Sequence, residues 1–201
     1  MSEALPVQEL TCSRPALQSR KLELLDHQDV AVYSVDYATW GGSKPDITLC
    51  LESGPQPGEV VGVAKFGGAF SSTIRFNLGN VDRRGQVRDG FTLERGSNWS
   101  FAYNWTTMSN GQGRALTWKK TSQRYRQIDP SVEARKGNLK LVDTATDEML
   151  AVILAKGWGK NFKFLFYRPL PPDQRHLILL TGLVLLEKQS RDDNHNNAHT
   201  G

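Results

Sequence analysis

Ten consecutive residues near the C-terminus, Leu177 to Leu186, constrain the fold more than any other part of the chain. They contain only Thr181 and Gly182 besides aliphatic side chains. As a helix they span about 15 Å, roughly half of a hydrocarbon core, so the run is too short to cross a bilayer. A helix that is apolar on every side must also be buried on every side. The rest of the chain must therefore surround it.

The chain before this helix alternates between apolar and polar residues, which is the pattern of half-buried β-strands. Phe162, Phe164 and Phe166 fall on one face with Lys163 on the other, and the four aromatic residues of 99–105 also share a face. This alternation is typical of antiparallel sheets. It predicts eleven strands, near 21–25, 30–37, 46–52, 59–66, 72–78, 90–95, 98–106, 114–120, 138–143, 148–155 and 161–167.

One hairpin pattern occurs more than once. Residues 21–33 and 139–152 each contain a strand, a turn led by Asp, and a second strand with Ala next to Val. Residues 47–64 follow a looser version across a longer turn rich in Gly and Pro. The pattern indicates a repeated hairpin, and chance similarity among hairpins is the alternative.

Amphipathic hairpins followed by one apolar C-terminal helix resemble the tubby C-terminal-like superfamily. This group includes the tubby proteins, the phospholipid scramblases and the LURP-one-related proteins, and the chain looks most like its uncharacterised fungal-type members. The resemblance is carried by the hairpin of 138–154, the strand Phe162–Tyr167 and the segment Leu177–Lys188. It implies an all-β fold with one helix: a closed antiparallel barrel of about twelve strands that encloses the C-terminal helix. Eleven strands fall one short, so we expect another near 7–12 or 123–128.

Such a barrel explains the helix physically. About eight strands already make an interior that side chains can just fill, so twelve leave room for a central helix. Gly182 in the middle of that helix costs about 1 kcal/mol relative to Ala. We expect barrel side chains to approach the helix closely at this position.

The length of 201 residues fits one domain with a sizeable core. We expect a flexible N-terminus over 1–15, the barrel domain over 16–190 and a disordered polar tail over 191–201. The first residues lack the basic and apolar regions of a secretory signal, which predicts a cytoplasmic protein whose Cys12 and Cys50 stay reduced.

The sequence contains no recognisable catalytic or metal-binding motif. It has no nucleophile elbow and no phosphate-binding loop, and two cysteines and four scattered histidines do not form a metal-ligand pattern. We therefore expect a protein that is not an enzyme and that uses no cofactor and no metal.

Positive charge gathers in one part of the chain. Residues 114–168 contain 12 basic and 5 acidic residues, a net charge of +7, although the whole chain carries only +4. A solvated, Lys- and Arg-rich sheet surface is the plain interpretation, and attraction of phosphate groups is the functional one. The strongest candidate site consists of Lys119, Lys120, Arg124 and Arg126, completed by Lys156, Lys160 and Lys163.

Two functions remain open at this point. The basic cluster and the family resemblance favour a peripheral module that binds anionic phospholipid head groups at a membrane surface. The alternative is a scaffold that binds protein and has no lipid or small-molecule ligand. Nucleic acid is disfavoured because a net charge of +4 without a reading motif falls short of the usual footprint. We expect a monomer without a transmembrane segment.

Overall fold

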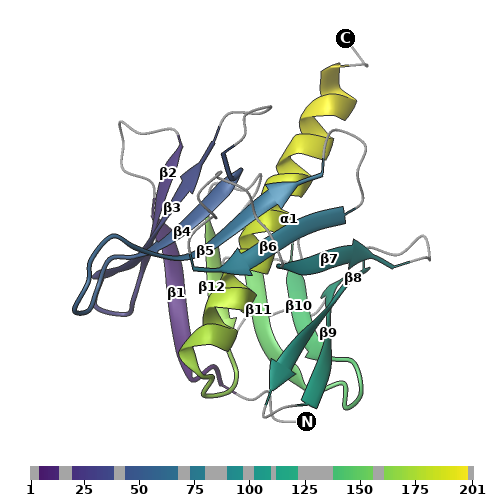
Figure 1. Cartoon of the computed structure of the whole chain (residues 1–201), viewed down its shortest axis with the longest axis horizontal. Coiled ribbons are helices and arrows are strands. Elements are labelled where there is room, and N and C mark those ends of the chain that lie inside the picture. The colour runs from purple at the N-terminus through teal and green to yellow at the C-terminus, as the bar shows by residue number, and fades with distance from the viewer. Residues whose placement is uncertain are drawn as a thin grey trace.

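The computed structural model describes residues 5–13, 20–38, 44–67, 73–79, 90–96, 102–109, 112–121, 138–155 and 161–198. These residues form twelve antiparallel strands that close into a barrel, followed by one helix (Figure 1). Each strand pairs with the next along the chain, and β1 closes the barrel by pairing with β12. The predicted fold class is confirmed. The elements are β1 (Gln8–Ser13), β2 (Lys21–Leu25), β3 (Ala31–Tyr37), β4 (Ile47–Leu51), β5 (Glu59–Phe66), β6 (Thr73–Leu78), β7 (Phe91–Arg95), β8 (Ala102–Ser109), β9 (Gln112–Lys120), β10 (Leu139–Asp143), β11 (Met149–Ala155), β12 (Phe162–Phe166) and α1 (Pro172–Ala198).

The two ends of the barrel are distinguished by the course of the helix. Because consecutive strands run antiparallel, the segments that connect them alternate between the two ends. Helix α1 enters at the end where β12 stops, which we call the helix-entry end. It leaves at the opposite, helix-exit end, beyond which its C-terminal part projects (Figure 1).

The interior of the barrel is filled by the helix. Every residue from Leu177 to Leu186 is buried, as the sequence predicts for a helix that is apolar all round. The inward side chains of the strands pack around it in one core. The largest completely buried side chains include Trp118, Tyr33, Tyr103, Phe76, Phe164 and Phe166.

The size of the inward side chains sets the position of the helix. The backbone of α1 runs closest to β5 and β6. On β5 the inner face carries Gly62, where an added Cβ would lie 3.1 Å from Cδ2 of Leu180. On the other side of the helix, a Cβ at Gly182 would lie 2.6 Å from Cε1 of Phe164 and 2.7 Å from Cδ1 of Ile153. The expected close approach at Gly182 is confirmed.

One polar contact lies inside this apolar core. The indole Nε1–H of Trp118 donates to the Thr181 hydroxyl at 2.9 Å, and that hydroxyl donates to the Leu177 carbonyl at 2.8 Å. Both side chains are completely buried, so each satisfies a group that would otherwise be costly to bury. The contact ties β9 to the helix at one register.

β11 and β12 are buried on their outer faces as well. Val152, Leu154 and Leu165 point away from the helix, yet they are completely or almost completely buried in a second apolar cluster. This explains why 149–155 is an almost continuous apolar run and not an alternating one.

The three hairpins that share a sequence pattern also share a structural irregularity. Among the described pairings, the register shifts only in β2–β3, β4–β5 and β10–β11, each time near the helix-entry end. In the first and last of these, an Asp carboxylate accepts backbone N–H bonds of the turn: Asp26 from Gln28 and Asp143 from Ala145. The repeat indicated by the sequence therefore corresponds to a bulged hairpin used three times.

Two boundaries differ from the sequence prediction. The segment 1–15, expected to be flexible, contains β1, because Leu10 and Cys12 point into the core; of the two places expected for the twelfth strand, the one near 7–12 is confirmed. The helix, expected to give way to a disordered tail at 191, continues to Ala198. Ion pairs one turn apart, Glu187 with Arg191 and Lys188 with Asp192, support this continuation.

We predict that Gly182→Ala destabilises the protein by about 1–3 kcal/mol, because overpacking outweighs the gain in helix propensity. The measurement is the free energy of unfolding in urea. Gly62→Ala is the matched control, because its nearest neighbour is the flexible end of Leu180, and it should cost less. Equal stability of Gly182→Ala and wild type would contradict the packing described here.

Candidate functional site

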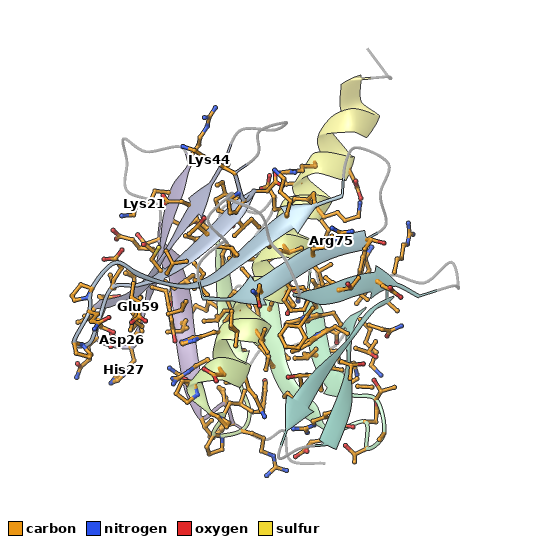
Figure 2. The ribbon with its side chains drawn as sticks, viewed as in Figure 1. Lys21, Asp26, His27, Lys44, Glu59 and Arg75 are labelled. Atoms are coloured by element: carbon orange, nitrogen blue, oxygen red, sulfur yellow. The ribbon has the colours of Figure 1, made fainter. Side chains whose placement is uncertain are left out.

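The connections that join strands at the two ends of the barrel differ in the charge of their sequences. The six segments that connect strands at the helix-exit end contain nine basic and three acidic residues. The segments at the helix-entry end, from the N-terminus to the β12–α1 connection, contain four basic and eight acidic residues. On one side of the barrel Figure 2 shows Lys21 and Lys44 toward the helix-exit end, with Asp26 and Glu59 toward the other.

The seven predicted site residues all belong to strand ends or connections at the helix-exit end. Lys119 and Lys120 end β9, and Lys163 lies at the start of β12. Arg124 and Arg126 lie in the β9–β10 connection, and Lys156 and Lys160 in the β11–β12 connection. These last four lie outside the described residues.

The structure does not bring the described lysines together. β10 and β11 lie between β9 and β12, which separates Lys119 from Lys163 by about 14 Å of sheet. The Lys163 ammonium donates to the Glu9 carboxylate of β1 at 2.6 Å, and the Lys119 ammonium donates to Asp147 at 2.8 Å. Each of the two lysines is therefore paired with its own carboxylate. We call the four neighbouring strands β9 to β12 the β9–β12 wall. Lys120 is exposed.

A further lysine on the β9–β12 wall, Lys140, was not among the site residues predicted from the sequence. Lys140 of β10 pairs in register with Lys119 of β9, and both point outward because the adjacent residues Trp118, Leu139 and Leu141 belong to the core. The alternation in Leu139-Lys140-Leu141 was a sufficient signal for an outward side chain. Its partner could not be read from the sequence, because the β9–β10 register spans a long connection.

The β10–β11 turn lies against β9 and places the Asp147 carboxylate beside the Lys119 ammonium. The Thr144 amide donates to the Ala115 carbonyl at 2.9 Å, and the hydroxyls of Thr144 and Thr117 lie 2.8 Å apart. Asp147 itself adopts a positive φ of 54°. The hydrogen bond and charge of Lys119, with a smaller contribution from Lys140, lower the pKa of Asp147 below its ordinary value. Asp147 is therefore ionised at neutral pH.

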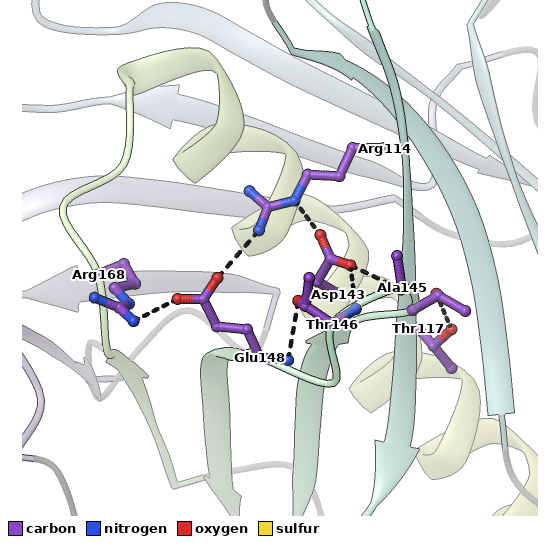
Figure 3. A network of polar contacts seen from close by, with 8 residues as sticks. Arg114, Thr117, Asp143, Ala145, Thr146, Glu148 and Arg168 are labelled. Carbon is purple, nitrogen blue, oxygen red and sulfur yellow. Dashed lines mark hydrogen bonds and ion pairs between the residues drawn. The ribbon is translucent and has the colours of Figure 1, made fainter.

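A network of ion pairs fixes the base of the same turn (Figure 3). Arg114 of β9 contacts both Asp143 and Glu148, and Glu148 also contacts Arg168 after β12 at 2.6 Å. Hydrogen bonds from Arg114 and from the Thr146 and Ala145 amides lower the pKa of the buried Asp143. The network joins β9, the β10–β11 turn and the segment after β12 at the helix-entry end. Its charged groups are paired with one another.

The described residues show no other cluster with an evident chemistry. No three His, Cys, Asp or Glu side chains among them lie close enough to hold a metal ion. Neither Cys12 nor Cys50 forms a disulfide. Within the described part of the chain, the only helix is not apolar over a length that would cross a membrane.

One solved structure shares the fold. It is the X-ray structure of a protein from Arabidopsis thaliana, AT5G01750, with a TM-score of 0.51 and 13% sequence identity. The match covers 95% of this chain and 94% of that protein. No protein-family model matches the chain, and neither does any curated protein. At this identity the likeness establishes a shared fold over the whole chain.

His176, in the first turns of α1, is half-buried at the mouth of the barrel. Its ring makes an edge-to-face contact with Tyr33, with ring centroids 5.6 Å apart. Burial and the nearby Arg175 lower the pKa of His176 from its ordinary value of 6.5, although Asp173 and Glu59 oppose the shift. The folded protein therefore favours the neutral form of the His176 ring.

This environment predicts a pH dependence of stability. Because the folded pKa lies below the unfolded one, the stabilisation is complete above about pH 6.5 and is lost as the pH falls through the folded value. The free energy of unfolding should decrease between about pH 7.5 and about pH 5, and His176→Phe should remove much of this slope. His27→Asn, at an exposed turn, is the control and should leave the slope unchanged. An identical slope in His176→Phe and wild type would contradict the assignment.

Proposed function

We propose that this protein is a non-enzymatic barrel module of the tubby C-terminal-like type that binds anionic phospholipid head groups at a membrane surface. The observation that carries the proposal is the excess of basic residues in the sequences that connect strands at the helix-exit end, nine against three acidic residues. The interior is occupied by α1, so a ligand binds on the outside of the barrel. Described carboxylates such as Asp143 and Glu148 are held in ion pairs, which does not favour acid–base chemistry.

The projecting helix favours one orientation at the surface. From Asp192 to Ala198 it extends about 10 Å and is polar, so it would obstruct flat, end-on contact with a bilayer. It leaves the barrel beside β5, where Arg191 lies 4.2 Å from the centre of the Phe66 ring. The β9–β12 wall lies across the barrel from β5. We therefore expect binding through the basic edge of the β9–β12 wall.

Binding of this kind should be weak and sensitive to salt. Each lysine or arginine near an anionic leaflet contributes about 1 kcal/mol, and the attraction falls off over about 8 Å at physiological salt. Four or five cations therefore suffice for reversible binding without insertion of apolar side chains.

A protein-binding scaffold is the second candidate. The pairing of Lys119 and Lys163 with carboxylates reduces the charge available for lipid. In addition, the apolar side chains of Leu5 and Val7 are 70% and 57% exposed near the helix-entry end, where Val30 is 49% exposed. Exposed apolar side chains mark a contact with another protein where they form a contiguous patch.

Sedimentation with vesicles distinguishes the two candidates. We expect the wild type to sediment with phosphatidylcholine vesicles containing phosphatidylinositol bisphosphate at about 50 mM salt, and less at about 150 mM. The triple variant Lys120→Ser, Arg124→Ser, Arg126→Ser should lose most of this binding. Arg83→Ser, Arg84→Ser, Arg88→Ser is the matched control, because it removes the same charge from the β6–β7 connection at the helix-entry end.

If both triple variants lose the same amount of vesicle binding, the binding depends on the net charge of the protein and not on this site. If the wild type stays in the supernatant at low salt, the lipid proposal is wrong. The scaffold candidate then leads to a search for a protein partner by pull-down.

A further inference from the structure

Lys119 and Lys140 lie directly opposite each other on the outer surface of neighbouring strands. They are register partners in the β9–β10 pair, and both point outward because Trp118 before Lys119, and Leu139 and Leu141 on either side of Lys140, are inward-facing core residues. Cross-strand partners have Cβ atoms about 5 Å apart, and like charges in such a pair repel each other. Two adjacent ammonium groups on a fixed sheet surface require a counter-charge.

Asp147 supplies the counter-charge in the free protein. Its carboxylate accepts a hydrogen bond from the Lys119 ammonium at 2.8 Å. The backbone of its turn is held in place from both sides, because the Asp147 amide donates to the Asp143 carbonyl and the Thr144 amide to the Ala115 carbonyl, each at 2.9 Å. The side chain, by contrast, is 75% exposed and that of Lys119 is 37% exposed. The carboxylate can therefore leave the lysine without opening the barrel.

We infer that Lys119 and Lys140 form a binding site for a phosphate group, and that the Asp147 carboxylate occupies this site in the free protein. The site deepens the proposed function, on which it rests for the class of its ligand. It lies on the β9–β12 wall, apart from the residues in the two connections at the helix-exit end.

The chemistry of the two anions favours exchange. A phosphate monoester carries about −1.5 to −2 charges at neutral pH and offers three acceptor oxygens, whereas a carboxylate carries one charge and two oxygens. One phosphate can accept hydrogen bonds from both ammonium groups, which a carboxylate bonded to Lys119 alone does not. Exposed ion pairs contribute little to stability, so displacing Asp147 costs little.

The variant Asp147→Asn tests the inference, because it removes the competing charge and Asn tolerates the positive φ. We expect it to bind inositol trisphosphate about 3- to 10-fold more tightly than the wild type in calorimetric titration. The double variant Lys119→Ser, Asp147→Asn should show no such gain, and neither should Lys140→Ser, Asp147→Asn.

Asp29→Asn is the matched control. Asp29 occupies the β2–β3 turn, across the barrel from β9, with a φ of 58° that is close to that of Asp147. The substitution removes the same charge from the same kind of turn. We expect unchanged binding. An equal gain in Asp29→Asn and Asp147→Asn, or a gain that persists without Lys119, would overturn the inference.

A second arm with vesicles containing phosphatidylinositol bisphosphate separates the site from the proposed function. Tighter binding of the soluble trisphosphate by Asp147→Asn without sedimentation of any variant would keep the phosphate site, reject the lipid, and indicate a soluble phosphate ester. The opposite result is sedimentation that depends on Lys120, Arg124 and Arg126, with Asp147→Asn changing neither the sedimentation nor the binding of inositol trisphosphate. That result would keep the lipid proposal and reject this site.

Discussion

The contact between the apolar stretch of α1 and the inner wall of the barrel is the interaction on which the other features depend. A twelve-stranded barrel is too wide for its own side chains to fill, and a helix that is apolar all round is unstable in water. Each therefore removes the other's exposed apolar surface. Because Gly62 and Gly182 have no side chain, the helix can approach β5 on one side and Phe164 on the other. The Trp118–Thr181 hydrogen bond fixes how far the helix enters the barrel.

A filled interior moves recognition to the outside of the barrel. The antiparallel meander begins alternate connections at opposite ends of the barrel, and the connections of the two ends differ in the charge of their sequences. The same topology leaves the β9–β12 wall across from the projecting helix, where neither the helix nor its polar end obstructs a large partner. On that wall the β10–β11 turn holds Asp147 beside Lys119, which links the hairpin geometry to the proposed control of anion binding.

Local patterns in the sequence predicted most of the fold, and long-range register explains what they missed. Alternation in Phe162–Phe166 and the apolar stretch of α1 report burial directly, so a sheet that surrounds a central helix followed from them, whereas the closed barrel was implied by the family resemblance. β1 was expected only as one of two alternatives, near 7–12 or 123–128, because only Leu10 and Cys12 mark its inner face. The pairing of Lys140 with Lys119, and of Lys163 with Glu9, depends on strands far apart in the chain, which no local pattern reports.

Hydrogen exchange measured by mass spectrometry tests the central claim most directly, because it reports the stability of each segment without a mutation. If the helix is part of the barrel core, the amides of 177–186 exchange only through global unfolding, with the same free energy as those of β11 and β12. The projecting residues after Arg191 should exchange much faster. Exchange of 177–186 by local opening, while β11 and β12 stay protected, would show that the barrel holds together without its helix and would contradict the account.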